Sequence, residues 1–181
     1  MKNLIILVLV FFGTVHVSAQ DQIKWMTMNE ALAAQKVKPK KIIMDAYTSW
    51  CGPCKLMDRN TFANKDVIAY INNYYYAVKF DAEGTEQVTY QDTQYGNPNH
   101  QADKRGRNSQ HDFARALKIN GYPSLVFFKE DSGLIQPIVG YHPPQNLEIY
   151  LKIFAKNDYL KLTTIEAWDA YQKDFKGTFE N

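Results

Sequence analysis

Short blocks of apolar residues, separated by polar breaks, run along the chain and change their spacing from block to block. Thr27-Met28-Asn29-Glu30 has the form of a capping box, which predicts a helix that continues to the break at Lys38-Pro39. Continuous apolar runs predict strands, and apolar residues three and four apart predict helices. We therefore expect helices at 27–37, after 54, around 67–71, at 109–120 and from 144, and strands at 41–46, 74–80, 124–128 and 135–139. This order predicts an α/β sandwich around a central mixed sheet.

The stretch 84–108 does not fit this alternation. It is longer than an ordinary connection in a compact domain, and loops of this length are usually functional or disordered. Within it, 88–90 could form a short strand, and Lys104, Arg105 and Arg107 form a small basic cluster. The stretch is either a mobile, solvated loop or an ordered segment beside the functional site, where it could narrow the choice of partners.

The chain after 157 predicts one further helix. Thr163-Thr164-Ile165-Glu166 is a capping box, and Ile165, Trp168, Tyr171 and Phe175 recur at helical spacing. Such an apolar stripe must be covered. We expect it to pack against its own domain, with an interface to a second copy or a partner as the alternative.

The first residues have the form of an export signal. Lys2 supplies a positive start, 4–12 an apolar segment, and Val17-Ser18-Ala19 a small-residue cleavage site before Gln20. We expect a mature chain that begins at Gln20 and works in the periplasm or outside the cell. An uncleaved membrane anchor is the alternative, although the apolar run is short for a bilayer span.

The charge of the chain argues against two classes of partner. It carries 21 Lys and Arg against 19 Asp and Glu, which gives a formal net charge of +2. A chain so close to neutral has no strong electrostatic preference for nucleic acid or for a membrane surface. We therefore expect neither as a partner, and the sequence leaves the oligomeric state open.

The two cysteines of the chain, Cys51 and Cys54, follow directly after an apolar, strand-like run. Two thiols at this spacing can form a disulfide and reopen it, and unpaired N–H groups at a helix start favour the reactive thiolate. Zinc would need further ligands at fixed spacing, and c-type haem would need a histidine where the chain has Lys55. A purely structural bridge over so short a loop would stabilise little. The pair predicts a redox site without metal, whose redox-active disulfide needs no separate cofactor.

Four landmarks carry a resemblance to the thioredoxin family. Trp50-Cys51-Gly52-Pro53-Cys54 is preceded by Asp45, and Lys79 follows in the next expected strand, before Gly121-Tyr122-Pro123-Ser124. Together they resemble that family's active-site motif, buried aspartate, strand lysine and cis-proline loop. The stretch 61–67 is similar to exported thioredoxin-like domains, including the C-terminal domain of the transmembrane disulfide reductase.

The resemblance covers roughly residues 25–156 and implies a thioredoxin-like α/β fold. In that fold a central mixed β-sheet is flanked by helices. Here it would carry a long inserted loop at about 84–108 and an extra C-terminal helix. We accordingly divide the chain into a signal peptide (1–19), a thioredoxin-like domain (20–157) and a C-terminal helical extension (158–181).

The resemblance also implies roles for the residues of the motif. Cys51, exposed at the helix start, would attack a substrate disulfide, and Cys54, one turn deeper, would resolve the mixed disulfide. Gly52 and Pro53 would allow the tight entry into the helix. Trp50 could contribute to an apolar rim that contacts substrates, with ordinary loop packing as the alternative.

Five residues outside the motif complete the expected site. Asp45 would take the proton of the Cys54 thiol, or else be a polar residue at a strand end, and Lys79 would pair with Asp45 or simply be solvated. Pro123 would be cis and present the backbone of Tyr122 to an extended substrate peptide. Tyr141 could join Trp50 in the rim.

These residues predict an exported thiol-disulfide oxidoreductase that reduces protein disulfides. Its partners would be disulfide-containing proteins and a membrane or exported thiol that supplies electrons. Oxidase or isomerase activity is the alternative, since the compartment and the tyrosine before Pro123 could shift the potential. A binding module whose cysteines are not essential is a second alternative.

Overall fold

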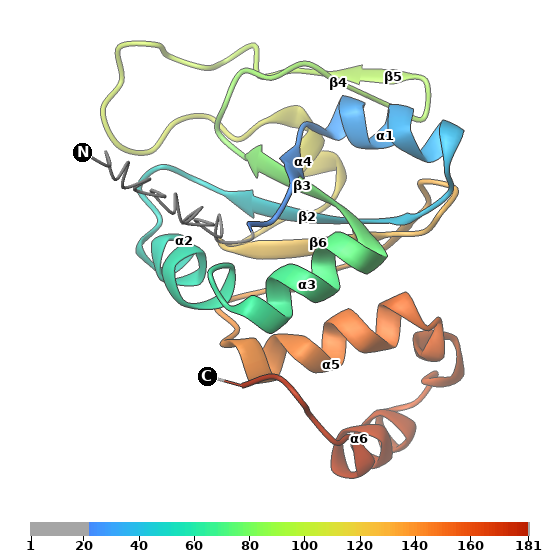
Figure 1. Cartoon of the computed structure of the whole chain (residues 1–181). Coiled ribbons are helices and arrows are strands. Elements are labelled where there is room, and N and C mark those ends of the chain that lie inside the picture. Colours follow the sequence, from blue (N-terminus) through green and yellow to red (C-terminus); the bar gives the residue numbers. More distant parts are fainter. Residues whose placement is uncertain (1–21, 181) are drawn as a thin grey trace, which may run out of the picture.

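The expected strands pair in one five-stranded mixed sheet (Figure 1). The structure is a computed structural model that describes residues 22–180, and the expected export signal lies outside the described residues. The strands are β1 (Trp25–Met26), β2 (Lys41–Tyr47), β3 (Tyr75–Asp81), β6 (Ser124–Phe128) and β7 (Leu134–Val139), in the order β1-β3-β2-β6-β7. β1 and β2 run parallel to β3, while β6 runs antiparallel to β2 and β7 antiparallel to β6. The sequence predicts every strand of this sheet except β1.

Helices cover both faces of this sheet, as Figure 1 shows. The helical elements of the described residues are α1 (Met28–Val37), α2 (Gly52–Leu56), the π-helical turn η1 (Met57–Thr61), α3 (Lys65–Tyr74), α4 (Asp112–Ala116), α5 (Pro144–Ala155), the 3-10 turn η2 (Asp158–Lys161) and α6 (Ile165–Asp174), the last of which lies beyond α5. Successive side chains of β2 point to opposite faces. Ile42 and Met44 face a core closed by α1 and α4, whereas Ile43 faces a second core closed by α3 and α5. The thioredoxin-like α/β fold expected from the sequence is confirmed.

Two helix starts differ from the expected capping boxes. The N-cap of α4 is His111, not Ser109, because the hydroxyl of Ser109 donates to Asn97 Oδ1 at 2.7 Å instead. This helix also ends at Ala116 rather than near 120, since Lys118 adopts a left-handed backbone with a φ of 57°. The N-cap of α6 is Thr164 rather than the expected Thr163, because the side chain of Thr164 accepts from the backbone N–H of Ala167.

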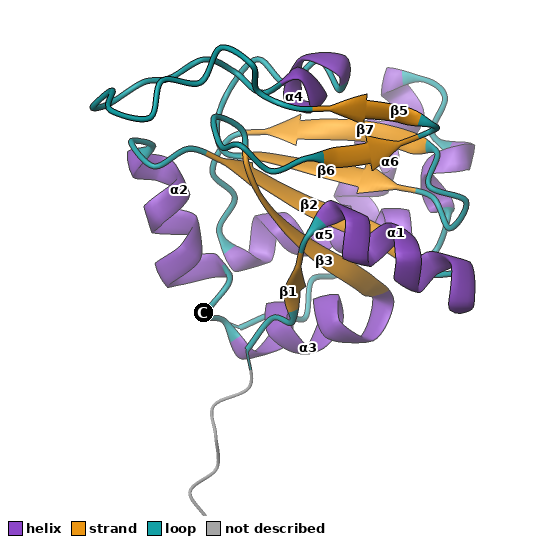
Figure 2. Ribbon diagram, turned by 90° about the horizontal axis from the view of Figure 1, so that it is seen from above, coloured by secondary structure: helices purple, strands orange, loops and turns teal. Residues whose placement is uncertain are grey.

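The insertion consists of a hairpin followed by an irregular loop. Its strands are β4 (Val88–Tyr90), which the sequence suggested, and β5 (Thr93–Tyr95), which it did not. Val88 and Tyr90 are buried in the core beneath α1 and α4. The interpretation of the whole stretch as a solvated loop is therefore wrong for the hairpin, whereas residues 101–107 are exposed. Both views place the loop after β5 on the same side of the molecule as α2 (Figure 1 and Figure 2).

The C-terminal extension packs on its own domain, as expected. Trp168 of α6 stacks on Tyr150 of α5 with ring centroids 5.8 Å apart. The chain then returns along α5, where the buried carboxylate of Glu148 accepts from the backbone N–H groups of Thr178 and Phe179. Within residues 22–180, no helix is long and apolar enough to cross a membrane.

Candidate redox site

The two cysteines lie at the start of α2, just after the loop that follows β2. Cys51 is the N-cap of α2, Pro53 lies in its first turn, and the two cysteines form a disulfide with an S–S distance of 2.08 Å. The backbone N–H of Cys54 donates to Cys51 Sγ at 3.1 Å. After reduction, this N–H and the positive end of the helix would stabilise a thiolate at Cys51.

The expected exposure of Cys51 is wrong for this oxidised state. Both Cys51 and Cys54 are only 2% exposed. The sulfur of Cys51 is bonded to Cys54 within the first turn of α2 and accepts a hydrogen bond there, so it faces the helix rather than solvent.

Asp45 is a buried carboxyl on β2, six residues before Cys51 and 1% exposed. Burial raises its pKa to about 6, although the positive charge of Lys79 acts to lower it. Its Oδ2 accepts from Lys79 Nζ at 2.7 Å, whereas its buried Oδ1 has no hydrogen-bond partner among residues 22–180. A carboxyl with this pKa and one free oxygen can accept a proton near neutral pH.

Lys79 joins Asp45 to a second carboxylate. β2 and β3 place Lys79 opposite Asp45, and its ammonium group also bonds Asp58 of η1. The same group lies over three aromatic rings, with centroid distances of 5.1 Å to Trp25, 4.9 Å to Tyr47 and 5.2 Å to Phe62. Burial opposes its charge, but the two carboxylates prevail and raise the pKa of Lys79. The expected ion pair between Lys79 and Asp45 is therefore present, and the three rings form an aromatic cage around its ammonium group.

Asp58→Asn is expected to lower the pKa of Asp45. The negative charge of Asp58 raises that pKa, and Asp58 also shares the ammonium group that lowers it. Without Asp58, Lys79 would pair with Asp45 alone. The measurement is the pH dependence of mixed-disulfide release, whose midpoint should move below that of the wild type. Asp92→Asn, which removes a charge from the exposed β4–β5 turn, is the control, and an upward shift in Asp58→Asn would contradict the assignment.

Pro123 lies just before β6, at the end of the sheet where β2 leads to the disulfide. The Tyr122–Pro123 peptide bond is cis, and the next residue, Ser124, pairs with Ala46 of β2. The Tyr122 ring meets Trp50 edge-on at 6.0 Å, and its hydroxyl accepts from Gln110 Nε2 at 3.1 Å. The roles expected for Tyr122 and Pro123 in binding a substrate backbone stay predictions.

The two aromatic residues of the expected rim have separate neighbours. Trp50 is half-buried and donates from Nε1 to Glu83 Oε2 at 2.8 Å. Tyr141 is 36% exposed, and its hydroxyl accepts from Asn60 Nδ2 of η1 at 3.4 Å. Trp50 therefore contacts the segment that directly follows β3, whereas Tyr141 contacts the α2–η1 segment. Gly52 lies in the first turn of α2 with open space around its Cα.

Sequence reasoning missed two carboxylates of the site. Asp58 lies four residues after Cys54. A helix that continued through Asp58 would place these two residues on the same face, which is the signal that could have revealed it. Glu83 lies just after β3. No local sequence pattern marks it, because its contact with Trp50 joins residues that are 33 positions apart. Of the described residues, no cluster of three or more Cys, His, Asp or Glu could hold a metal ion.

Comparison with known proteins finds one domain family. The sequence profile described as "Thioredoxin-like domain" matches residues 28–155. Thioredoxin AMT13 of Alternaria alternata is 39% identical over 46 residues, which are 25% of this chain and 37% of that protein. The match thus spans little more than a third of that relative's length.

Solved structures resemble the fold at low sequence identity. A structure described as "DsbH Oxidoreductase" is 18% identical, has a TM-score of 0.53, and the alignment covers 83% of this chain and 93% of that one. A thioredoxin-fold protein from Helicobacter pylori is 13% identical, with a TM-score of 0.57 and coverage of 85% and 89%. These likenesses bear on the fold alone.

Proposed function

The chain belongs to the thioredoxin-like domain family, and from this premise we propose that it is an exported enzyme that reduces protein disulfides through the Cys51/Cys54 dithiol. Family and disulfide together support thiol-disulfide oxidoreductase chemistry. Export and the direction of electron flow are the finer parts of the proposal. Export is supported by the form of residues 1–19, and reduction by the Gly-Pro pair between the cysteines, which resembles the reducing members of the family.

The observation that carries the proposal is the disulfide at the start of α2, together with the buried carboxyl of Asp45. The thiolate of Cys51 would attack a substrate disulfide, which forms a mixed disulfide and releases one substrate thiolate. Asp45 would take the proton of Cys54. The Cys54 thiolate would then attack Cys51 Sγ and release the second substrate thiol. Two electrons pass to the substrate, and an external dithiol must restore the Cys51/Cys54 pair.

The direction of electron flow is tested by the reduction potential of the purified protein. The protein is equilibrated in glutathione buffers of different ratio, and the fractions of dithiol and disulfide are measured by alkylation and mass spectrometry. A reductase is expected to have a potential near that of thioredoxin, roughly −270 mV. A potential near roughly −120 mV would instead favour the oxidase alternative. A pair that never interconverts would reject both.

A further inference from the structure

The loop that follows the β4–β5 hairpin is fastened to the residue before the nucleophile. One oxygen of Glu83, Oε2, accepts from both Trp50 Nε1 and the backbone N–H of Asn108, each at 2.8 Å. The side chain of Asn108 in turn bonds the backbone of Gln101 twice, through its Oδ1 at 3.0 Å and its Nδ2 at 2.8 Å. Residues 101–108 therefore form a closed loop, which we call the tip, and a single carboxylate joins its base to Trp50.

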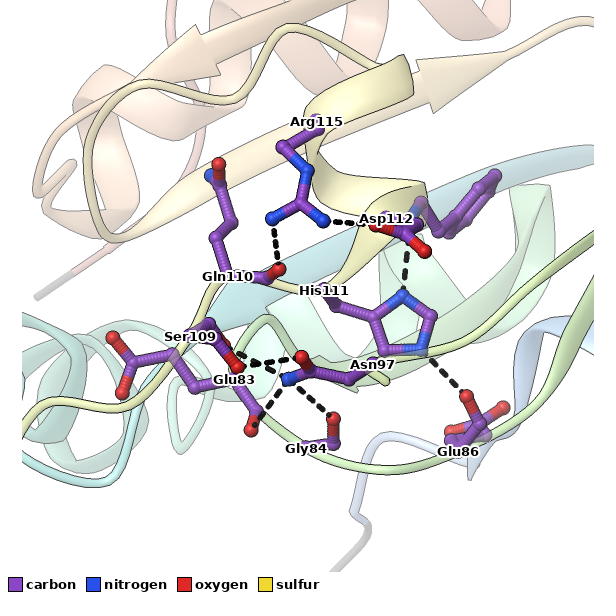
Figure 3. Close-up of polar contacts among 10 residues, drawn as sticks. Glu83, Gly84, Glu86, Asn97, Ser109, Gln110, His111, Asp112 and Arg115 are labelled. Atoms are coloured by element: carbon purple, nitrogen blue, oxygen red, sulfur yellow. Dashed lines mark hydrogen bonds and ion pairs between the residues drawn. The ribbon is translucent and has the colours of Figure 1, made fainter. Parts of the chain in front are cut away.

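A second anchor holds the chain on either side of the tip (Figure 3). Asn97 is 8% exposed, and its Nδ2 lies within hydrogen-bond distance of the carbonyl oxygens of Glu83, Gly84 and Ser109. Its Oδ1 accepts from the hydroxyl of Ser109 at 2.7 Å. Both ends of the tip are thus tied to the segment that directly follows β3, so its position relative to the site is defined before any partner arrives.

Arg107 places the tip directly against the redox motif. Its guanidinium carbon lies 4.4 Å from the centre of the Trp50 ring, which Tyr122 also contacts edge-on. Lys104 is three residues from Arg107, which limits the distance between their Cα atoms to about 11 Å. The basic side chains therefore lie within about one or two Debye lengths of the residue next to Cys51 at physiological salt.

The tip carries positive charge that forms no ion pair with the described part of the chain. Lys104, Arg105 and Arg107 are all exposed, and within residues 22–180 none of them forms an ion pair. The single carboxylate of the tip is Asp103. The carboxylate of Glu83, at the base, is already occupied by two N–H donors. A ligand that lies beside Trp50 would meet a net positive surface on this side.

We propose that the tip is a docking surface that selects protein partners with acidic residues next to the disulfide to be reduced, because Glu83 and Arg107 fix its basic side chains beside Trp50. This inference rests on the proposed function. It adds a substrate class, and it assigns Glu83 and Asn108 as positioning residues for the docking surface. Exposed charges attract an approaching partner over a distance set by salt, so the preference should weaken as ionic strength rises.

The test compares two peptides with the same internal disulfide, one flanked by glutamates and the other by glutamines. Protein that has first been reduced is mixed with each peptide in a single turnover, so that no electron donor is needed, and the two rate constants are expressed as an acidic-to-neutral ratio. The test variant is Lys104→Gln, Arg105→Gln. The control is Lys36→Gln, Lys38→Gln, which removes the same charge from exposed positions at the end of α1, next to the opposite end of β2.

The wild-type ratio should exceed one, and the test variant should lower it by about fivefold at low salt, while the control keeps the wild-type ratio. A ratio near one in the wild type, or an equal fall in the control, would overturn the docking proposal and leave disulfide reduction intact. If the wild type reduced neither peptide, the proposed function itself would fall, and the docking proposal with it.

Discussion

Replacing Cys51 with serine is expected to reduce the rate of disulfide reduction to that of the reaction without protein. A hydroxyl cannot form the mixed disulfide, and Cys54 cannot replace the attacking thiol because it lies within α2 rather than at the N-cap, where backbone N–H groups favour a thiolate. The measurement is the single-turnover reduction of a disulfide peptide by the reduced protein. Ala33→Ser, on the exposed side of α1, introduces the same side chain far along the sequence from the motif and should keep the full rate.

The companion variant, Cys54→Ser, separates the two steps. Its Cys51 thiolate should still attack the substrate disulfide, but the mixed disulfide should persist because no second thiol can resolve it. One adduct per protein molecule is expected by mass spectrometry, and proteins trapped from an extract would identify substrate and electron donor. If Cys51→Ser kept the rate of disulfide reduction, the assignment of Cys51 as the nucleophile would be wrong. If the double serine variant kept the full biological function, the binding-module alternative would be favoured over the oxidoreductase.

Much of this fold could be predicted from local sequence. Continuous apolar runs such as 124–128 and the helical spacing of Val67, Ile68 and Ile71 reflect burial within single elements, so the pattern alone locates them. The spacing of Asp45 from the cysteines also follows from local geometry, because one strand and one turn separate them. Lys79 meets Asp45 because the register of two neighbouring parallel strands sets them side by side.

The remaining features depend on contacts between distant segments. β1 has only two residues and is a strand only because it pairs with β3, so no periodicity could reveal it. The aromatic cage around Lys79 comes from three separate parts of the chain. The contact of Arg107 with Trp50 depends on the irregular path of the insertion, which is determined by side-chain bonds from Asn97 and Glu83 rather than by hydrophobic pattern.

Asp45→Asn is expected to stabilise the folded protein at pH 7. Burial raises the pKa of Asp45 to about 6 from its ordinary value of 3.8, so between these values the folded state binds the proton more tightly than the unfolded chain does. The stability from this group is lost as the pH rises from about 4 to about 6, and the loss is complete above that range. The shift corresponds to about 3 kcal/mol of unfolding free energy, which an amide avoids because it cannot ionise. Urea unfolding should show the gain at pH 7, little gain at pH 4, and none for Asp92→Asn.

The same substitution is expected to slow release of the mixed disulfide by about a hundredfold at pH 7, because the proton of Cys54 loses its acceptor. Attack by Cys51 should change little, since the start of α2 and not Asp45 stabilises its thiolate. The slowing should shrink below pH 6, where the wild-type carboxyl is itself protonated. Stopped-flow measurement of the two steps separates them, and equal slowing of both would contradict the assigned role. Because one carboxyl produces both effects, a variant that gained stability and kept its release rate would show that another group takes the proton and that the buried charge of Asp45 has no chemical use in this site.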